Sequence, residues 1–152
     1  MGRIVGAVIA GFLALSGIIT VLTFAFFFGL GADRAFKPSS YEPSMLWILI
    51  MFVVGFVAAV IGGWTSFKIA NNSQGPKWLA VVVLVLGILY ALPALTATPT
   101  KEPRPSGITD KKTMEKGQTP TWVALSLPVI GVAGVWVGGW RRRSGNSAPA
   151  AL

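Results

Sequence analysis

The sequence predicts an all-α fold, a bundle of four transmembrane helices, and two observations carry this prediction. Only 12% of the 152 residues are charged, against about 25% in soluble domains, and 53% are hydrophobic. Four stretches contain no charged residue at all, and each is longer than the roughly 20 residues that cross a hydrocarbon core. Because backbone groups in lipid must form their hydrogen bonds within the segment, each stretch is expected to be a helix.

The four helices are expected at about 4–29, 45–69, 77–97 and 120–140, and they form one membrane domain over 1–140. The first stretch exceeds the roughly 7–15 residues of a signal-peptide core, so we expect it to remain as a helix. The outer loop at 98–119 has three prolines and almost no apolar residue, so it is expected to be mobile or ordered by a partner. The basic tail at 141–152 is expected to be disordered.

Charges at the helix ends predict the topology. Arg3, Lys68, Lys77 and Arg141–Arg143 lie at the end that holds both termini, with no acidic residue among them. The other end has seven Lys and Arg against these six, so the raw count of the positive-inside rule does not decide. Because the six lie directly at helix ends, we predict that both termini and the tail are cytoplasmic, in a bacterial inner membrane. We attribute the net charge of +8 to this topology and to anionic lipid headgroups, and not to nucleic-acid binding.

Tryptophan residues near the expected helix ends indicate an aromatic belt at each membrane surface. Amphipathic rings favour the headgroup level, and cations beside them hold a helix end in place. The expected interface anchors are Trp47, Trp64, Trp78, Trp122, Trp140, Arg141, Arg142 and Arg143.

Small residues recur at every fourth position on three of the predicted helices, a spacing that lets two helix backbones approach closely. One interpretation is packing inside the bundle. The other is a face for a second membrane protein, since three such rows exceed what one internal seam needs. The expected helix-packing residues are Gly6, Ala10, Gly11, Gly55, Ala59, Gly62, Gly63, Gly134, Gly138 and Gly139.

The triplet Gly-Gly-Trp occurs twice, at 62–64 and at 138–140, and basic residues follow it each time. A shift of 76 positions superimposes the two copies and also brings Gly55 onto Gly131. This pattern favours a tandem duplicated helical hairpin with a pseudo-twofold axis along the membrane normal. Chance recurrence in helices rich in glycine and valine is the alternative.

The chain has few residues that could catalyse a reaction or bind a metal ion. It has no Cys and no His, and all five acidic residues lie in the predicted outer loops, so we expect no catalytic or metal site and no required cofactor. Bound lipid, or contact with a pigment or quinone without histidine ligation, is compatible with the sequence. The only candidates to line a polar cavity are Ser16, Thr20, Thr23 and Ser126.

Two segments carry a resemblance to a known group. "RIVGAVIAGFLA" opens the first helix, and the second helix closes with "GGWTSFKIA" after a compact outer loop. In these features the chain resembles small four-helix bacterial inner-membrane proteins of uncharacterised function. The resemblance implies the same topology and no catalytic residues.

These observations lead to two hypotheses for function. The first is a non-catalytic accessory subunit that packs against other integral membrane proteins of a larger bacterial complex, for which respiratory and photosynthetic assemblies are candidate hosts. The second is a small transporter or channel for a neutral or lipophilic solute, acting as a homo-oligomer. A continuous polar or aromatic-lined cavity reaching mid-membrane would favour the second hypothesis over the first.

Overall fold

The structure is a computed structural model that describes residues 2–37, 40–96 and 119–140. Its helices are α1 (Gly2–Leu30), α2 (Ala32–Ala35), α3 (Met45–Ala70), α4 (Gln74–Thr96) and α6 (Thr121–Trp140). Four of them are long and apolar enough to cross a membrane, so the chain is a multi-pass membrane protein and the predicted all-α four-helix bundle is confirmed. The predicted tail, and the predicted outer loop except for Thr119, lie outside the described residues.

Two helices end at residues in the left-handed backbone conformation. α1 ends at Gly31 (φ 75°), whose N–H donates to the Phe27 carbonyl at 2.9 Å. α3 ends at Asn71 (φ 53°), whose N–H donates to the Phe67 carbonyl at the same distance. Glycine and asparagine tolerate this conformation best, so these two residues stop the helices and allow the chain to turn back.

α4 begins at Gln74, three residues before the expected position of 77. The cause is local, because the Asn72 side-chain oxygen accepts a hydrogen bond from the Gln74 N–H at 3.0 Å. Pro76 then lies in the first turn, where the missing N–H of a proline costs the helix nothing. The connection between α3 and α4 is therefore even shorter than the sequence indicated.

Hydrogen bonds of Ser44 hold the compact loop between α1 and α3 in place. Its hydroxyl donates to the Arg34 carbonyl at 2.7 Å and accepts from the Trp47 N–H at 3.2 Å, which caps α3. The Ser44 N–H also donates to the Ala35 carbonyl at 2.8 Å. Beneath this loop, Phe27 packs edge-to-face on Trp47, with ring centroids 5.7 Å apart.

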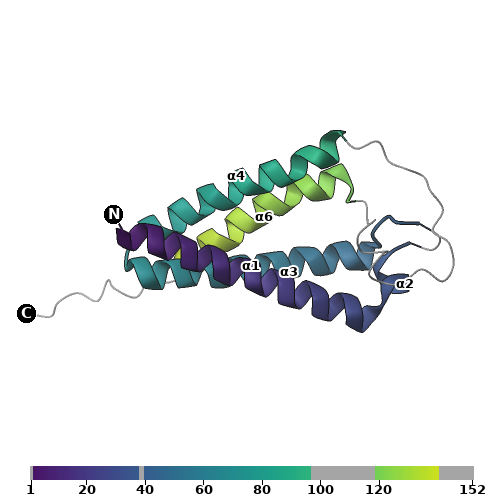
Figure 1. The fold of residues 1–152 in the computed structure, drawn as a ribbon, viewed down its shortest axis with the longest axis horizontal. Coiled ribbons are helices and arrows are strands. Elements are labelled where there is room, and N and C mark those ends of the chain that lie inside the picture. The colour runs from purple at the N-terminus through teal and green to yellow at the C-terminus, as the bar shows by residue number, and fades with distance from the viewer. Residues whose placement is uncertain (1, 38–39, 97–118, 141–152) are drawn as a thin grey trace, which may run out of the picture.

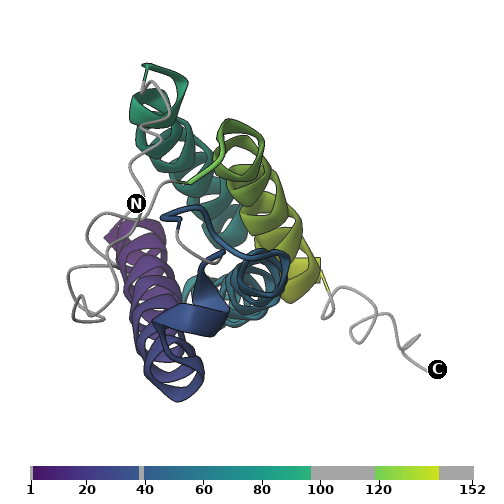
Figure 2. The same ribbon diagram turned by 90° about the vertical axis from the view of Figure 1, so that its right-hand side faces the viewer.

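The long helices form two antiparallel hairpins, which we call the first hairpin (α1 with α3) and the second hairpin (α4 with α6). Figure 1 shows the hairpins converging at the end that carries the N-terminus and diverging toward the other end. We call these the closed end and the open end. Seen from the open end, the two hairpins occupy opposite sides of the bundle (Figure 2).

The two hairpins are joined mainly where α3 crosses α6. A Cβ atom added to Gly134 would lie 2.6 Å from the Ala59 Cβ, so the two backbones are in direct contact there. On either side, Gly63 lies against the Val135 backbone and Gly138 lies against the Val60 backbone. Glycine is required at these positions because any side chain would push the helices apart.

Candidate functional site

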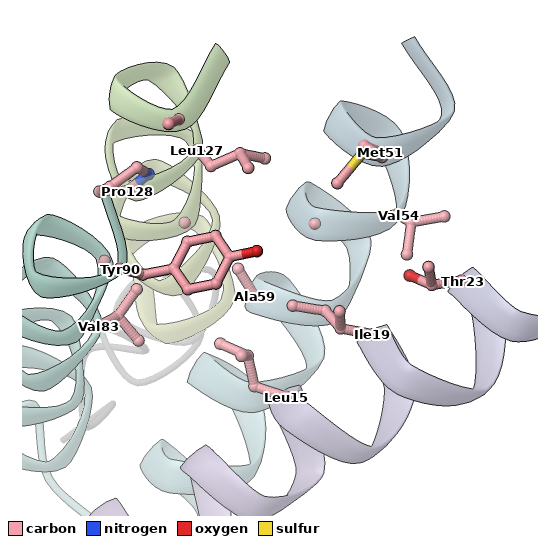
Figure 3. A pocket seen from close by; sticks show the side chains of 14 residues that line it. Leu15, Ile19, Thr23, Met51, Val54, Ala59, Val83, Tyr90, Leu127 and Pro128 are labelled. Carbon is pink, nitrogen blue, oxygen red and sulfur yellow. The ribbon is translucent and has the colours of Figure 1, made fainter. Parts of the chain in front are cut away.

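Beyond this crossing the hairpins separate, and a cavity of about 260 Å³ opens between them. All four long helices contribute to its lining, which is almost entirely apolar. Figure 3 shows Leu15 and Ile19 of α1 facing Val83 and Tyr90 of α4 across this space. The remaining lining residues are Thr23, Met51, Val54, Gly55, Ala59, Gly87, Ala124, Leu127, Pro128 and Gly131.

Two hydroxyl groups interrupt the apolar lining. The Tyr90 ring extends from α4 across the cavity, and the Thr23 hydroxyl faces the same space from α1 (Figure 3). Neither hydroxyl forms a hydrogen bond with any residue that the structure describes. Tyr90 is 71% exposed and Thr23 is half-buried, so neither hydroxyl is sealed inside the protein, and in lipid each would be stabilised by a partner with acceptor atoms.

The two hydroxyls lie at the same depth in the bundle. Thr23 precedes the end of α1 at Leu30 by seven residues, and Tyr90 precedes the end of α4 at Thr96 by six. At 1.5 Å per residue, both lie roughly 10 Å below the open end. They therefore face the cavity from opposite hairpins within the apolar part of the membrane.

Pro128 shapes the wall of the cavity on α6. Its ring lies so close to α4 that a Cβ on Gly87 would come within 2.7 Å of the Pro128 Cγ. Proline has no N–H, so the Ala124 carbonyl loses the donor that it would have in a regular helix. Pro128 and Ala124 both belong to the lining of the cavity.

Of the four hydroxyl residues that the sequence singled out, only Thr23 lines this cavity. The Thr20 hydroxyl donates to the Ser16 carbonyl and the Ser126 hydroxyl donates to the Trp122 carbonyl, at 2.8 and 2.7 Å, so each bonds its own helix. Tyr90 was missed by the sequence reasoning. The signal available in the sequence was that Tyr90 is a single tyrosine in an otherwise aliphatic predicted helix.

The predicted helix-packing residues divide into two groups. Gly11 and Gly62 meet in the seam between α1 and α3, where a Cβ on Gly62 would lie 2.9 Å from the Gly11 carbonyl oxygen. Ala59, Gly63, Gly134 and Gly138 form the crossing of α3 and α6, and Gly139 lies against Pro76 of α4. In contrast, a Cβ added to Gly6 or Gly55 would meet nothing within 4 Å, and Ala10 is half-buried.

The two Gly-Gly-Trp triplets do not occupy equivalent places. Gly62 faces α1 and Gly63 faces α6, whereas Gly138 faces α3 and Gly139 faces α4. The contacts at the crossing instead follow a shift of 75 positions, which carries Ala59 onto Gly134, Val60 onto Val135 and Gly63 onto Gly138. One residue of difference corresponds to a rotation of about 100° around the helix, which explains why the glycines of the triplets face different neighbours.

The predicted tryptophan anchors differ in burial. Trp64, Trp78 and Trp122 are exposed on the outside of the bundle, and the Lys68 ammonium lies 4.7 Å from the Trp64 ring centre. Trp47 is only 6% exposed and packs on Phe27, so it belongs to the protein core. The side chain of Trp140 and the residues Arg141, Arg142 and Arg143 lie outside the described part of the chain.

The chain matches no family model, and no curated protein or solved structure is significantly similar to it. The resemblance to small four-helix inner-membrane proteins therefore stays a prediction.

Proposed function

We propose that the protein is a non-catalytic membrane protein that binds a neutral, lipophilic molecule in the cavity between its two hairpins. One observation carries the proposal: Thr23 and Tyr90 present two hydroxyls to one apolar cavity, at one depth, without a partner among the described residues. A molecule with oxygen acceptors would satisfy both donors and fill the space. This function shares the neutral or lipophilic solute of the second hypothesis from the sequence, but proposes binding where that hypothesis had a transporter or channel.

The cavity limits the class of ligand. Its lining carries no charged side chain, which favours a neutral molecule. Its volume of about 260 Å³ is below the roughly 300–1,000 Å³ of drug-sized sites, so it suits a single ring or a short polar head. An apolar tail would leave through the open side into lipid. A quinone with a prenyl or alkyl tail has this combination of ring, carbonyl acceptors and tail.

Binding is favoured over conduction by the packing at the closed end. At the closed end, α3 lies against α6 at Ala59 and Gly134, and α1 lies against α3 at Gly11 and Gly62, so these two pairs of helices leave no gap for a solute there. Passage through the bundle would require these backbone contacts to separate. We therefore propose a binding protein, or a carrier that opens at this end, in place of a channel.

Binding can be measured with the full chain in lipid nanodiscs and a short-chain alkyl benzoquinone, read by quenching of tryptophan fluorescence. Gly55→Leu should abolish saturable binding, because Gly55 lines the cavity and a Cβ there meets open space. Gly17→Leu is the matched control, since Gly17 is equally open but lies outside the cavity lining. Tyr90→Phe should weaken binding by about threefold to tenfold, the usual effect of one lost hydrogen bond.

The proposal fails if the wild-type chain shows no saturable quenching, or if the two leucine variants bind the probe equally well. A complementary measurement is mass spectrometry of lipophilic molecules that purify with the protein from its native membrane. Enrichment of one oxygen-bearing neutral species in the wild type, and its loss in Gly55→Leu, is the expected result.

An accessory subunit remains a second candidate because one face of α1 is unused. Gly2, Gly6 and Gly17 are exposed, and a Cβ on any of them would meet nothing within 4 Å. Most other glycines in the predicted rows pack inside the bundle. They are therefore not available to a second protein, which weakens the support for an accessory subunit. Size analysis after gentle detergent extraction tests it, since a 16.0 kDa monomer without a partner contradicts it.

We also propose that both termini are cytoplasmic and that the membrane is a bacterial inner membrane. The support is that Arg3, Lys68 and Lys77 lie directly at helix ends of the closed end, whereas the basic residues described at the open end, Arg34 and Lys37, lie in the connection between α1 and α3. Reporter fusions test the topology. Alkaline phosphatase should be inactive when joined to the C-terminus and active when inserted in the 98–119 loop.

A further inference from the structure

A second apolar space lies on the outside of the bundle, separate from the cavity between the hairpins. It is a groove of about 450 Å³ between α1 and α4 at the closed end. Aliphatic side chains of α1 between Ile4 and Ile9 form one wall, and Trp78 and Val82 of α4 form the other. Gln74, at the start of α4, is its single polar lining residue.

The dimensions of the groove fit one leaflet of a bilayer. Its wall on α4 runs from Gln74 to Val82, which corresponds to roughly 12 Å along the helix. Half of a hydrocarbon core is roughly 15 Å thick. The groove is therefore as deep as one acyl chain of the leaflet at the closed end, and it ends where the polar headgroups begin.

Two basic residues are next in sequence to lining residues of the groove. Arg3 directly precedes the first lining residue of α1, and Lys77 directly precedes Trp78. Both side chains are exposed, and neither forms an ion pair with a described residue. With Gln74, they bring hydrogen-bond donors and two charges to the closed end of the two helices that form the groove, the level at which a lipid phosphate would lie.

We propose that this groove is a binding site for one anionic phospholipid, with an acyl chain between α1 and α4 and its phosphate at Arg3, Lys77 and Gln74. Charge complementarity favours this occupant. Two cations beside an apolar groove match the phosphate and the acyl chain of a lipid, whereas a transmembrane helix of a partner protein would offer an apolar surface only. Trp78 closes the side of the site with an amphipathic ring at the level of the ester groups. The site is independent of the cavity that holds the proposed lipophilic ligand.

Native mass spectrometry of the full chain in detergent, titrated with phosphatidylglycerol or with phosphatidylcholine of the same acyl chains, tests the site. The wild type should bind phosphatidylglycerol more tightly. Lys77→Gln should weaken that binding about fivefold and leave phosphatidylcholine unaffected. Lys68→Gln is the matched control, because Lys68 lies at the same end of the bundle but against Trp64, outside the groove. It should have no effect.

A second pair of variants tests the apolar part of the site. Val5→Trp fills the groove and should weaken the binding of both lipids, whereas Val21→Trp places the same ring on an exposed position of α1 outside the groove and should not. Circular dichroism establishes that both variants are folded. Equal weakening by Lys68→Gln and Lys77→Gln would mean diffuse attraction by the basic end. Unchanged binding in Val5→Trp would mean that no chain occupies the groove, and either result overturns the proposal.

Discussion

Ala59 and Gly134 touch at the centre of the bundle, where a Cβ on Gly134 would lie 2.6 Å from the Ala59 Cβ. The contacts on either side are reciprocal, since Gly63 lies on Val135 and Gly138 lies on Val60. The two residues thus mark a local pseudo-twofold axis that exchanges α3 and α6. The same shift of 75 positions carries Trp47 onto Trp122.

This register predicts which engineered cysteines form a cross-link. Ala59→Cys with Gly134→Cys should oxidise to a disulfide after the helices separate by about 1 Å, because disulfide-bonded Cβ atoms lie about 3.8 Å apart. Ala58→Cys with Gly134→Cys should not, since Ala58 is rotated by about 100° around α3. The natural chain has no Cys, so gel mobility under non-reducing conditions reports only the engineered pair. Equal cross-linking of both pairs would contradict the register.

Adding a side chain to the glycines of the crossing should lower the stability of the bundle. Gly138→Ala places a methyl group on the Val60 carbonyl, and Gly63→Ala places one on the Val135 backbone. Because backbone cannot move aside as a side chain can, each variant should lose about 1–3 kcal/mol of unfolding free energy or more. The two losses should be similar, since the pseudo-twofold axis exchanges the sites. Unfolding in mixed micelles by sodium dodecyl sulfate measures them.

Gly6→Ala and Gly17→Ala are the controls for these substitutions. Both glycines are exposed on α1, and a Cβ on either meets nothing within 4 Å. Alanine is the better helix former, so these variants should not lose stability. A loss in Gly6→Ala as large as that in Gly138→Ala would show that the measurement reports something other than packing.

The fold was predictable because lipid imposes strong constraints on sequence. The charge-free stretches gave four spans, and the short turn after Lys68 gave an antiparallel connection. The register of the repeat was not predictable in the same way. Shifts of 75 and 76 positions both superimpose valine and glycine residues, and the two Gly-Gly-Trp triplets favour the shift of 76. Only the contacts of individual glycines distinguish the two, because a one-residue shift changes which helix each glycine faces.

The cavity was less accessible to sequence reasoning. Hydroxyl residues were identified by type, but Thr20 and Ser126 bond their own helices and only Thr23 lines the space. The cavity itself arises because the hairpins diverge beyond the contact of Ala59 with Gly134, and no residue pattern encodes that angle. The sequence alone cannot identify Tyr90 as a cavity residue, because only the structure shows that a space separates it from the opposite hairpin.

The effects of substitutions at Gly87 and Pro128 on stability should be coupled. Gly87→Ala directs a methyl group at the Pro128 ring, which is too rigid to give way, so it should destabilise the second hairpin by about 1–3 kcal/mol. In a Pro128→Ala background the same substitution should cost much less, because the ring is gone. A double-mutant cycle on unfolding free energy measures this coupling. Additive effects would show that Gly87 and Pro128 do not share the space.

Trp47 and Trp122 are related by the shift of 75 positions but should respond differently to truncation. Trp47 is 6% exposed and packs on Phe27, whereas Trp122 is 52% exposed. Trp47→Ala should lose about 3 kcal/mol, at the low end for a buried tryptophan because lipid and not water surrounds the bundle. Trp122→Ala should lose far less, and Trp47→Phe should recover part of the loss by keeping a ring against Phe27. Equal losses in the two alanine variants would mean that Trp47 acts as a headgroup anchor, as the sequence alone suggested.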